Sequence, residues 1–456
     1  MQQTHRATTP PRAAPACAVA PLVTDVLVVG GGPCGATAAD DLARAGVDVT
    51  LVDRAGRIKP CGGAIPPQAL VDFELPRDVL EAEVSCARMI SPSARAVDMP
   101  IDSGFVGMVD RGSFDEWLRA RAAERGARRL TATFRAFADD GATGADGRVG
   151  VTLRTADGDD VAVRARYVLG ADGANTRVGR AAVPGSERMK RVHAYHEIVA
   201  APRTGDAPGD GAAGGAGGAG GAGGADGPFG TDAARCDVVY DGALSPDFYS
   251  WVFPHGDVVS VGTGSAVKGF GLRGSVAELR RRAGLDTAKT IRTEGAPIPM
   301  KPLGRWDDGR HVLLAGDAAG VVAPSSGEGI YYAMACGRIA ATTLAEALAG
   351  AGPAHLRLAR KRFLRAHGKV FLVLGIMQRF WYSSDRRRER FVTMCEDPDV
   401  QRLTWEAYLN KKLVRRDPLA HARIFWKDTL HLLGLGRADG ARRGRAGREA
   451  APAADA

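Results

Sequence analysis

Asp25-Val26-Leu27-Val28-Val29-Gly30-Gly31-Gly32-Pro33-Cys34-Gly35 is the stretch of sequence that decides the fold. Residues 25–29 are a short run rich in β-branched apolar side chains, which predicts a buried strand. An Ala-rich helical pattern follows over residues 36–45, and Gly46 ends that helix. Residues 47–52 predict a second strand. The stretch and its surroundings therefore predict a β-α-β unit, the building block of an α/β fold.

The glycine spacing in this unit matches G-x-G-x-x-G, a pattern with a physical reading. Gly30 permits a tight turn, Gly32 lets the backbone approach a pyrophosphate, and Gly35 lets the helix and strand pack closely. The helix start directs free N–H groups at the phosphates. Asp53 follows Gly35 by 18 residues and can accept hydrogen bonds from ribose hydroxyls, whereas its charge would repel a 2′-phosphate. We therefore expect a site for FAD or NAD, with the adjacent Arg54 included in it.

Two further aspartates beside glycines follow predicted strands. Asp172 lies in Gly170-Ala171-Asp172-Gly173, directly after a strand predicted over residues 161–169. Gly316 and Asp317 follow the apolar run at residues 312–315, and Ser325-Ser326-Gly327-Glu328-Gly329 then opens a helix predicted over residues 330–348. Asp317 is suited to binding a ribose or ribityl hydroxyl. The helix start at Gly327 and Gly329 can stabilise negative charge, such as that on the N1–C2=O edge of a reduced flavin.

Taken in this order, the three motifs resemble those of the group-A flavoproteins, the family with the p-hydroxybenzoate-hydroxylase-like fold. The resemblance covers residues 24–350 and implies that the cofactor is FAD. It also implies that Arg111 contacts FAD, because Arg111, Asp115 and Leu118 fit the family's R-x-x-x-D-x-x-L helix start. The implied fold class is α/β (α+β), in which a Rossmann-like FAD-binding domain is interleaved with an antiparallel-sheet substrate domain and followed by a C-terminal helical region.

Two other segments resemble geranylgeranyl reductases of (bacterio)chlorophyll biosynthesis. One is Lys59-Pro60-Cys61-Gly62-Gly63-Ala64-Ile65-Pro66, and the other is Phe248-Tyr249-Ser250-Trp251-Val252-Phe253-Pro254, which is similar to that family's Y-x-W-x-F-P segment lining the substrate cavity. The resemblance implies NADPH-dependent reduction of a geranylgeranyl group to phytyl, with NADPH docking transiently over FAD. We hypothesise catalytic roles for Cys61 and Tyr249. The implied substrate-binding residues are Gly62, Gly63, Trp251, Phe253 and Pro254.

The implied reaction needs a proton donor as well as a hydride, because an isolated alkene is a poor hydride acceptor. No acid stands out among the motifs. Cys61 is our first choice, Tyr249 and a flavin-bound water are further candidates, and His255 is a weaker one. No second G-x-G-x-x-G turn directly after a predicted strand is available for NADPH, including in the Gly/Ala-rich segment at residues 205–229. The arginines at residues 386–388 either meet its 2′-phosphate or form a solvated or lipid-facing basic patch.

The composition of the chain limits the class of protein, its partners and its localisation. The chain has 45% hydrophobic and 25% charged residues, which is ordinary for a soluble globular protein. Its net charge of +9 indicates a solvated basic surface or attraction to an anionic cofactor or lipid surface. No zinc-finger spacing or aromatic–basic pattern predicts nucleic-acid binding. The seven cysteines include no C-x-x-C pair, so we expect neither a metal site nor a redox dithiol. With no secretory signal and no long apolar run, we expect a cytoplasmic protein.

The motifs divide the chain into interleaved domains. We expect residues 23–75, 105–180 and 300–350 to form the FAD-binding domain. Residues 76–104 and 181–299 are then the substrate domain. Such interleaving means that each domain is completed by segments far apart in the sequence.

The remaining segments lie outside these two domains or interrupt them. Residues 351–434 predict a helical region, and residues 1–22 and 435–456 predict disordered tails. Residues 205–229 predict a flexible Gly/Ala insertion, because such a segment buries too little apolar surface to offset its ordering entropy. The apolar run at residues 370–377, followed by aromatic and basic residues, is either a buried helix or an interfacial one. In the second case the protein contacts the photosynthetic membrane peripherally.

Three alternative functions stay open at this point. An aromatic-ring hydroxylase of the same fold would consume oxygen together with its substrate. An archaeal-type reductase would act on geranylgeranyl ether lipids. A flavin-holding interaction subunit would bind FAD without being reduced by NADPH. For the favoured function, the sequence leaves open whether the partner is an isoprenoid-tailed pigment or a free prenyl diphosphate.

Overall fold

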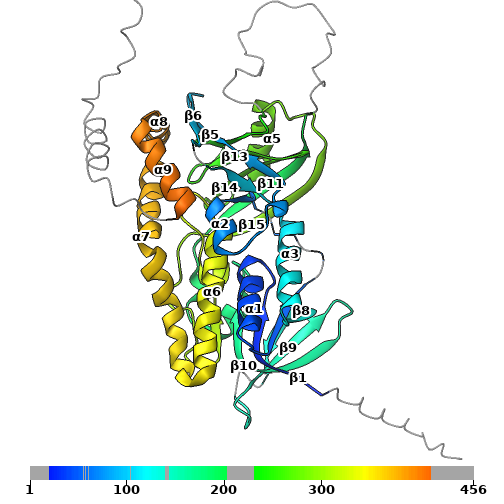
Figure 1. Cartoon of the computed structure of the whole chain (residues 1–456). Helices are drawn as coiled ribbons and strands as arrows, with labels where there is room; N and C mark the ends of the chain where they lie inside the picture. The colour runs from blue at the N-terminus through cyan, green and yellow to red at the C-terminus, as the bar shows by residue number, and fades with distance from the viewer. Residues whose placement is uncertain are drawn as a thin grey trace, which may run out of the picture.

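The computed structural model describes residues 20–411, except residues 55, 57, 60, 103, 139–142 and 203–230. The predicted tails, apart from residues 20–22, lie outside the described residues. The predicted Gly/Ala insertion and the helical region beyond residue 411 lie outside them as well. The described chain forms two large sheets with helices packed around them (Figure 1).

The first large sheet contains the predicted β-α-β unit. Its strands are β1 (Leu22–Val29), β2 (Val49–Asp53), β8 (Arg128–Phe137), β9 (Val149–Thr155), β10 (Asp160–Gly170) and β16 (Val312–Leu314). All of these strands except β9 pair in parallel, in the order β8-β2-β1-β10-β16. Strand β1 starts at Leu22, which is one residue inside the predicted tail. The predicted hairpin is present, because β9 runs antiparallel to both β8 and β10. This order brings the carboxyl ends of β1, β2, β10 and β16 to one edge, where ligands bind in such sheets.

Helices cover this sheet, and all of them except α3 begin at or after a glycine motif. They are α1 (Pro33–Arg44), α3 (Arg111–Glu124), α4 (Arg177–Ala182) and α6 (Ile330–Glu346). Pro33 occupies the first helical position of α1, where its missing N–H costs nothing. Figure 1 shows α1 between α3 and α6, and both neighbours contact it. Gly337 of α6 permits this approach, since a Cβ there would lie 2.3 Å from the Cys34 carbonyl oxygen.

The second large sheet is antiparallel, as predicted, except at one pair of strands. Its order is β15 (Thr290–Pro299), β11 (Arg191–Ala200), β14 (Val258–Ser265), β13 (Ser250–His255), β12 (Arg235–Val239), β5 (Cys86–Ile90) and β6 (Ala96–Pro100). The exception is the parallel pairing of β12 with β5. These two strands belong to distant segments, so no hairpin dictates their relative direction. Helix α5 (Leu272–Arg282) packs on β11 and β14.

A small third sheet and α2 (Pro67–Asp72) lie in the segments between the large sheets. Its strands are β3 (Ala64–Ile65), β7 (Val106–Met108) and β4 (Ala82–Val84). Because β7 pairs with both β3 and β4, this sheet joins segments that we assign to different domains. The domain boundaries near residues 75 and 105 therefore stay a prediction.

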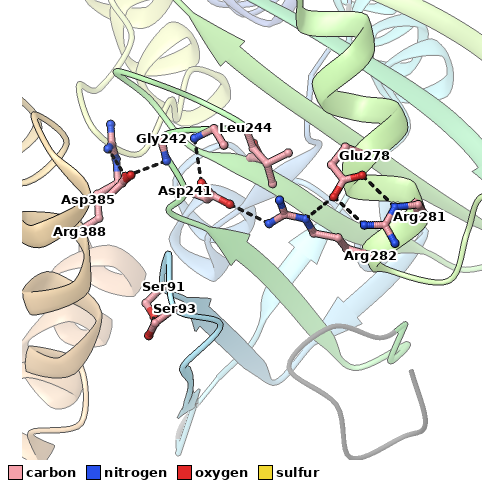
Figure 2. Close-up of polar contacts among 12 residues, drawn as sticks. Ser91, Ser93, Asp241, Gly242, Leu244, Glu278, Arg281, Arg282, Asp385 and Arg388 are labelled. Atoms are coloured by element: carbon pink, nitrogen blue, oxygen red, sulfur yellow. Dashed lines mark hydrogen bonds and ion pairs between the residues drawn. The ribbon is translucent and has the colours of Figure 1, made fainter. Parts of the chain in front are cut away.

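The C-terminal helical region contains α7 (Leu358–Trp381), α8 (Asp385–Met394) and α9 (Pro398–Asn410) among the described residues. Figure 1 shows α7 alongside α6, and the two helices are in contact. Figure 2 shows how α8 meets the second sheet, where the Asp385 carboxylate accepts a hydrogen bond of 2.9 Å from the Gly242 N–H. In the same view, Arg282 of α5 pairs with Asp241 at 2.7 Å.

One of the predicted surface arginines is buried. Arg388 is 3% exposed and its guanidinium bonds to Asp385 at 2.6 Å and to the Pro246 and Tyr382 carbonyl oxygens. The prediction of a solvated or phosphate-binding role for Arg388 is therefore wrong, because its donors hold α8 against the loop after β12. Arg386 is exposed, and Arg387 lies 4.4 Å from the centre of the Phe380 ring.

Candidate active site

A cavity of about 700 Å³ lies where the carboxyl edge of the first sheet meets the second sheet. Most of the site residues predicted from the sequence line it. They are Gly30, Gly32, Asp53, Arg54, Cys61, Gly62, Arg111, Asp172, Tyr249, Trp251, Phe253, Asp317, Gly327 and Gly329. The structure thus brings together three glycine motifs and the two segments that resemble reductase motifs, and their individual roles stay predictions.

Four other predicted site residues lie beside the cavity without lining it. A Cβ on Gly35 would lie 1.8 Å from the Gly30 carbonyl oxygen, and one on Gly316 would lie 2.8 Å from the Cys34 Cβ. Gly63 has φ of +75°, and a Cβ there would lie 2.5 Å from His255 Nε2. These glycines therefore act through packing. The fourth is Pro254, whose side chain points to the opposite face of β13 from Phe253, because successive side chains alternate along a strand.

The glycine-rich turn after β1 presents backbone without side chains at its glycines. The carboxylate of Asp53 lies at the end of the neighbouring strand β2. A Cβ on Gly30 would lie 2.3 Å from the Ala171 carbonyl oxygen, so only glycine fits there. Asp53 accepts hydrogen bonds from the Arg54 N–H at 2.8 Å and from Arg119 Nη1 at 3.1 Å. Burial raises the pKa of Asp53, while Arg119 opposes that shift. Arg119 also donates to the Gly31 carbonyl at 3.2 Å, so it fixes both the turn and the carboxylate.

Asp172 caps α4 and keeps one oxygen free. Its Oδ2 accepts hydrogen bonds from the N–H groups of Arg177 at 2.6 Å and Val178 at 3.2 Å. Burial raises its pKa, and these hydrogen bonds oppose the rise. The other oxygen, Oδ1, is buried and has no hydrogen-bond partner among the described residues. A buried acceptor of this kind suits a ligand hydroxyl.

Asp317 lies in a short 3₁₀ helix, η4 (Gly316–Ala319), after β16. Its Oδ2 lies 2.5 Å from the Nζ of Lys59, and the Asp317 side chain is 7% exposed. Lys59 also lines the cavity. The pair therefore brings one positive and one negative group to the wall that includes the start of α6.

Arg111 is the first residue of α3 and lines the cavity. Its guanidinium makes a two-pronged ion pair with Asp115 at 2.8 and 2.7 Å, and both side chains are buried. Burial acts to lower the pKa of Arg111, but the Asp115 carboxylate outweighs it and the pKa is raised. The nearby Cys61 side chain adds a smaller contribution to the raised pKa of Arg111. Cys61 Sγ accepts a hydrogen bond of 3.4 Å from the Gly63 N–H.

Aromatic side chains form the wall contributed by the second sheet. Tyr249 lies directly before β13, and Trp251 and Phe253 follow on the cavity-lining face of that strand. Their ring centres are 6.0 Å apart for Tyr249 and Trp251 and 6.3 Å apart for Trp251 and Phe253. Gly62 makes room for this wall, since a Cβ there would lie 3.1 Å from the Phe253 ring. The Tyr249 hydroxyl donates to the Ser326 carbonyl at 2.6 Å, and burial raises its pKa.

A buried ion pair lies at the glycine-rich loop that opens α6. Lys411 Nζ is 2.5 Å from Glu328 Oε2, and the two side chains are 3% and 7% exposed. The same Nζ lies 3.9 Å from the centre of the Tyr408 ring. Burial raises the pKa of Glu328 and lowers that of Lys411, while their mutual attraction opposes both shifts. The pair therefore fastens the end of α9 to a loop whose neighbouring residues, Gly327 and Gly329, line the cavity.

Some residues of the cavity wall are not evident from the sequence. Lys59, Arg119 and His196 all line the cavity, yet no motif in the sequence predicts a site role for any of them. Lys59 meets Asp317, which lies 258 residues away in the sequence, and Arg119 meets Asp53, which lies 66 residues away. Separations of this size leave no local spacing that could serve as a signal, so only the structure shows these pairs.

His255, the weaker candidate for the proton donor, does not suit that role. Its side chain is buried, and its Nδ1–H donates to the Phe253 carbonyl at 3.2 Å. Burial lowers the pKa of His255 to about 4, so the imidazole is neutral near pH 7 and has no proton to spare.

The cavity fits FAD on two observations. The turn at Gly30 excludes any side chain and leads directly into α1, which supplies a backbone cradle for a pyrophosphate. Asp172 Oδ1 is a buried acceptor without a partner among the described residues, as a ribityl or ribose hydroxyl requires. Residues 24–217 match the family described as pyridine nucleotide-disulphide oxidoreductase. Fold and site thus define an FAD-dependent oxidoreductase.

Relatives narrow this class to one family. The chain is 51% identical over 412 residues to geranylgeranyl diphosphate reductase of Rhodobacter capsulatus, a match that covers 90% of this chain and 98% of that protein. It therefore belongs to the geranylgeranyl diphosphate reductase family. It is 29% identical over 427 residues to digeranylgeranylglycerophospholipid reductase 2 of Methanopyrus kandleri, covering 86% of this chain and 96% of that one.

A solved structure shares the fold. The geranylgeranyl bacteriochlorophyll reductase-like protein of Thermoplasma acidophilum matches with a TM-score of 0.71 and 22% identity, over 88% of this chain and 100% of that one. The predicted fold class is thereby confirmed. None of the helices in the described residues is long and apolar enough to cross a membrane.

Proposed function

We propose that this protein reduces C=C bonds of a geranylgeranyl group to give phytyl, on (bacterio)chlorophyll or on geranylgeranyl diphosphate, with NADPH as the transient reductant. The observation that carries the proposal is the aromatic wall of Tyr249, Trp251 and Phe253 in the same cavity as the FAD-site residues. A wall of this kind suits an isoprenoid chain, because the chain is apolar along its whole length. The 51% identity to a reductase named for this substrate supports the same assignment.

Each reduced double bond takes up one hydride and one proton, so that NADPH, H⁺ and an alkene give NADP⁺ and an alkane. Bound FAD supplies the hydride transfer. The protein must supply the proton at the other alkene carbon.

We assign the proton to Cys61, with Tyr249 as the second candidate. Cys61 lines the cavity opposite the aromatic wall, and its sulfur accepts a hydrogen bond from the Gly63 N–H. Tyr249 also lines the cavity, but its O–H already donates to the Ser326 carbonyl. Delivery of that proton would leave the tyrosinate in a buried position, which the raised pKa of Tyr249 disfavours.

Product analysis tests the proposal. Anaerobic incubation with NADPH and either geranylgeranyl-bacteriochlorophyll or geranylgeranyl diphosphate should yield a product heavier by three H₂ equivalents, detected by mass spectrometry. The substrate that reacts identifies the natural form of the isoprenoid. Reduction of a geranylgeranyl ether lipid alone would favour the archaeal-type activity, and a hydroxylated product that requires O₂ would favour a hydroxylase. Either outcome would overturn the assignment.

We also propose a peripheral contact with an anionic membrane through α7. Leu372 and Ile376 are 65% and 60% exposed on this helix, and Phe371 is buried against the core. The exposed Lys369 and Arg379 lie on either side of them along the helix. An apolar patch between cations suits a lipid surface that bears negative charge. Flotation with phosphatidylglycerol vesicles at low salt should carry the protein upward, whereas the Leu372→Glu/Ile376→Glu variant should stay at the bottom.

A further inference from the structure

Four residues from four adjacent strands of the second sheet form one row beside the cavity. Glu294 of β15 pairs in register with His196 of β11, His196 pairs with Gly262 of β14, and Gly262 pairs with Trp251 of β13. Residues paired across a sheet point to the same face. The row therefore leads from the edge strand β15 to the aromatic wall.

Hydrogen bonds connect this row through Ser260, which lies two residues before Gly262 in β14. Trp251 Nε1 lies 3.1 Å from Ser260 Oγ, and an indole can only donate. The Ser260 hydroxyl is then available to donate to His196 Nδ1, at 3.0 Å. His196 Nε2 donates to Glu294 Oε2 at 2.8 Å. Each group in this series therefore donates a hydrogen bond to the next one, from Trp251 through Ser260 and His196 to Glu294.

Gly262 explains why the indole occupies this place. A Cβ on Gly262 would lie 2.2 Å from Trp251 Cζ2 and 2.6 Å from His196 Cβ. The indole therefore lies directly over the backbone of β14. From there it reaches the opposite wall, where a Cβ on Gly62 would lie 3.9 Å from Trp251 Nε1. Trp251 thus faces the segment that carries Cys61.

The polar chain continues beyond Glu294 to that opposite wall. Arg292 Nε lies 2.8 Å from Glu294 Oε1, and Arg292 Nη2 is also paired with Asp110. Asp110 caps the start of α3 by accepting a hydrogen bond of 2.7 Å from the Gly112 N–H. The next residue, Arg111, is buried and lines the same cavity as Cys61. One chain of polar contacts therefore connects the aromatic wall with the start of α3 on the other side of the cavity.

We propose that His196, held by Glu294 and acting through Ser260, is a positioning residue that fixes the Trp251 indole opposite Cys61 and so sets how an isoprenoid chain lies in the cavity. This inference rests on the proposed function for its substrate. Rotation of the indole would leave a buried hydroxyl and a buried imidazole without their partners, which makes a single orientation strongly favoured. A substrate chain that meets a fixed wall presents the same alkene carbons to the reacting groups at each turnover.

The experiment compares His196→Leu and Ser260→Ala with the wild type and with His193→Leu. His193 lies on the same strand, three residues away, and is exposed, so it serves as a matched control. The first readout is the Trp251 indole ¹H–¹⁵N resonance, identified as the one lost in Trp251→Phe. It should shift and exchange faster with solvent in His196→Leu and Ser260→Ala, and stay unchanged in His193→Leu. This readout needs no substrate.

The second readout is turnover with the geranylgeranyl substrate. We expect FAD content and the rate of flavin reduction by NADPH to stay at the wild-type level in both variants. KM for the isoprenoid should rise roughly tenfold, with more partly reduced product released. His196→Gln should restore most of the loss, since a side-chain amide supplies both a donor and an acceptor.

The results of these measurements distinguish a failure of the proposed function from a failure of the proposed positioning of Trp251. If the wild type reduces no isoprenoid but the indole resonance responds as described, the proposed function fails and the positioning of Trp251 stands. If the resonance is unmoved in Ser260→Ala, or if KM and product distribution match the wild type in a reductase that works, the inference is overturned. If His196→Leu fails to fold, Ser260→Ala still tests the positioning of Trp251, because it removes only a single oxygen.

Discussion

Lys411→Met tests how the end of α9 is held to the glycine-rich loop that opens α6. Methionine keeps the length and most of the volume of lysine but carries no charge. The variant leaves the Glu328 carboxylate, 7% exposed, without its cation, and the second oxygen of that carboxylate already has no hydrogen-bond partner among the described residues. Removing one partner of a buried ion pair costs about 3–5 kcal/mol, because the remaining charge is not compensated. We expect a loss of stability in this range.

The loss should depend on pH in a direction set by Glu328. Burial raises the pKa of this carboxyl, and Lys411 opposes the rise, so the variant raises the pKa further. Between the unfolded and the folded pKa, the folded state binds more protons than the unfolded state, and stability falls as pH rises through that window. The destabilisation by Lys411→Met should therefore be smaller at about pH 5.5 than at about pH 8.

Urea unfolding followed by circular dichroism measures both effects. Lys361→Met, which replaces an exposed lysine on α7, is the matched control and should change stability by less than about 0.5 kcal/mol. The double variant Lys411→Met/Glu328→Gln should recover at least half of the loss, because no unpaired charge remains. A Lys411→Met protein as stable as the control, or a double variant as unstable as the single one, would refute the reasoning.

Three further substitutions address the cavity itself. Gly35→Ala should give a colourless protein that does not retain FAD, because its Cβ would lie 1.8 Å from the Gly30 carbonyl oxygen; absorbance in the flavin band of the visible spectrum reports the cofactor. Cys61→Ala should bind FAD normally and slow alkene reduction about 100-fold, and full turnover would remove Cys61 from the mechanism. Asp317→Asn should weaken FAD binding about tenfold in titrations followed by flavin fluorescence, and an unchanged affinity would exclude a contribution from the Asp317 charge.

Local physics explains why much of the fold can be predicted from the sequence. The β1-α1-β2 unit and the β9-β10 hairpin each lie within a few dozen residues, where glycine positions and apolar runs determine the structure. The parallel pairing of β12 with β5 joins distant segments, and the sequence carries no sign of its direction.

For the site residues too, local patterns can be predicted from the sequence, whereas contacts between distant segments cannot. Motif residues such as Gly30, Asp172 and Asp317 can be found because their neighbours in the sequence reveal the turn. The partners of His196 and Lys411 are Glu294, 98 residues away, and Glu328, 83 residues away. Such pairs depend on how whole elements pack, so no local pattern predicts them. The prediction for Arg388 is wrong for a related reason, since a run of arginines does not show which one points inward.

β16 has a consequence for the way the protein is made. This strand completes the sheet beside β10, and it leads to Asp317 and to the start of α6. All of these lie at residue 312 or later, whereas the glycine turn is complete by residue 35. At about 5–20 residues per second, a ribosome needs roughly 15–60 seconds to cover that interval. From the completion of β10 at Gly170 to the end of that interval, the nascent chain exposes the uncovered edge of β10, so we expect a chaperone at the exit tunnel to protect that edge until flavin can be captured.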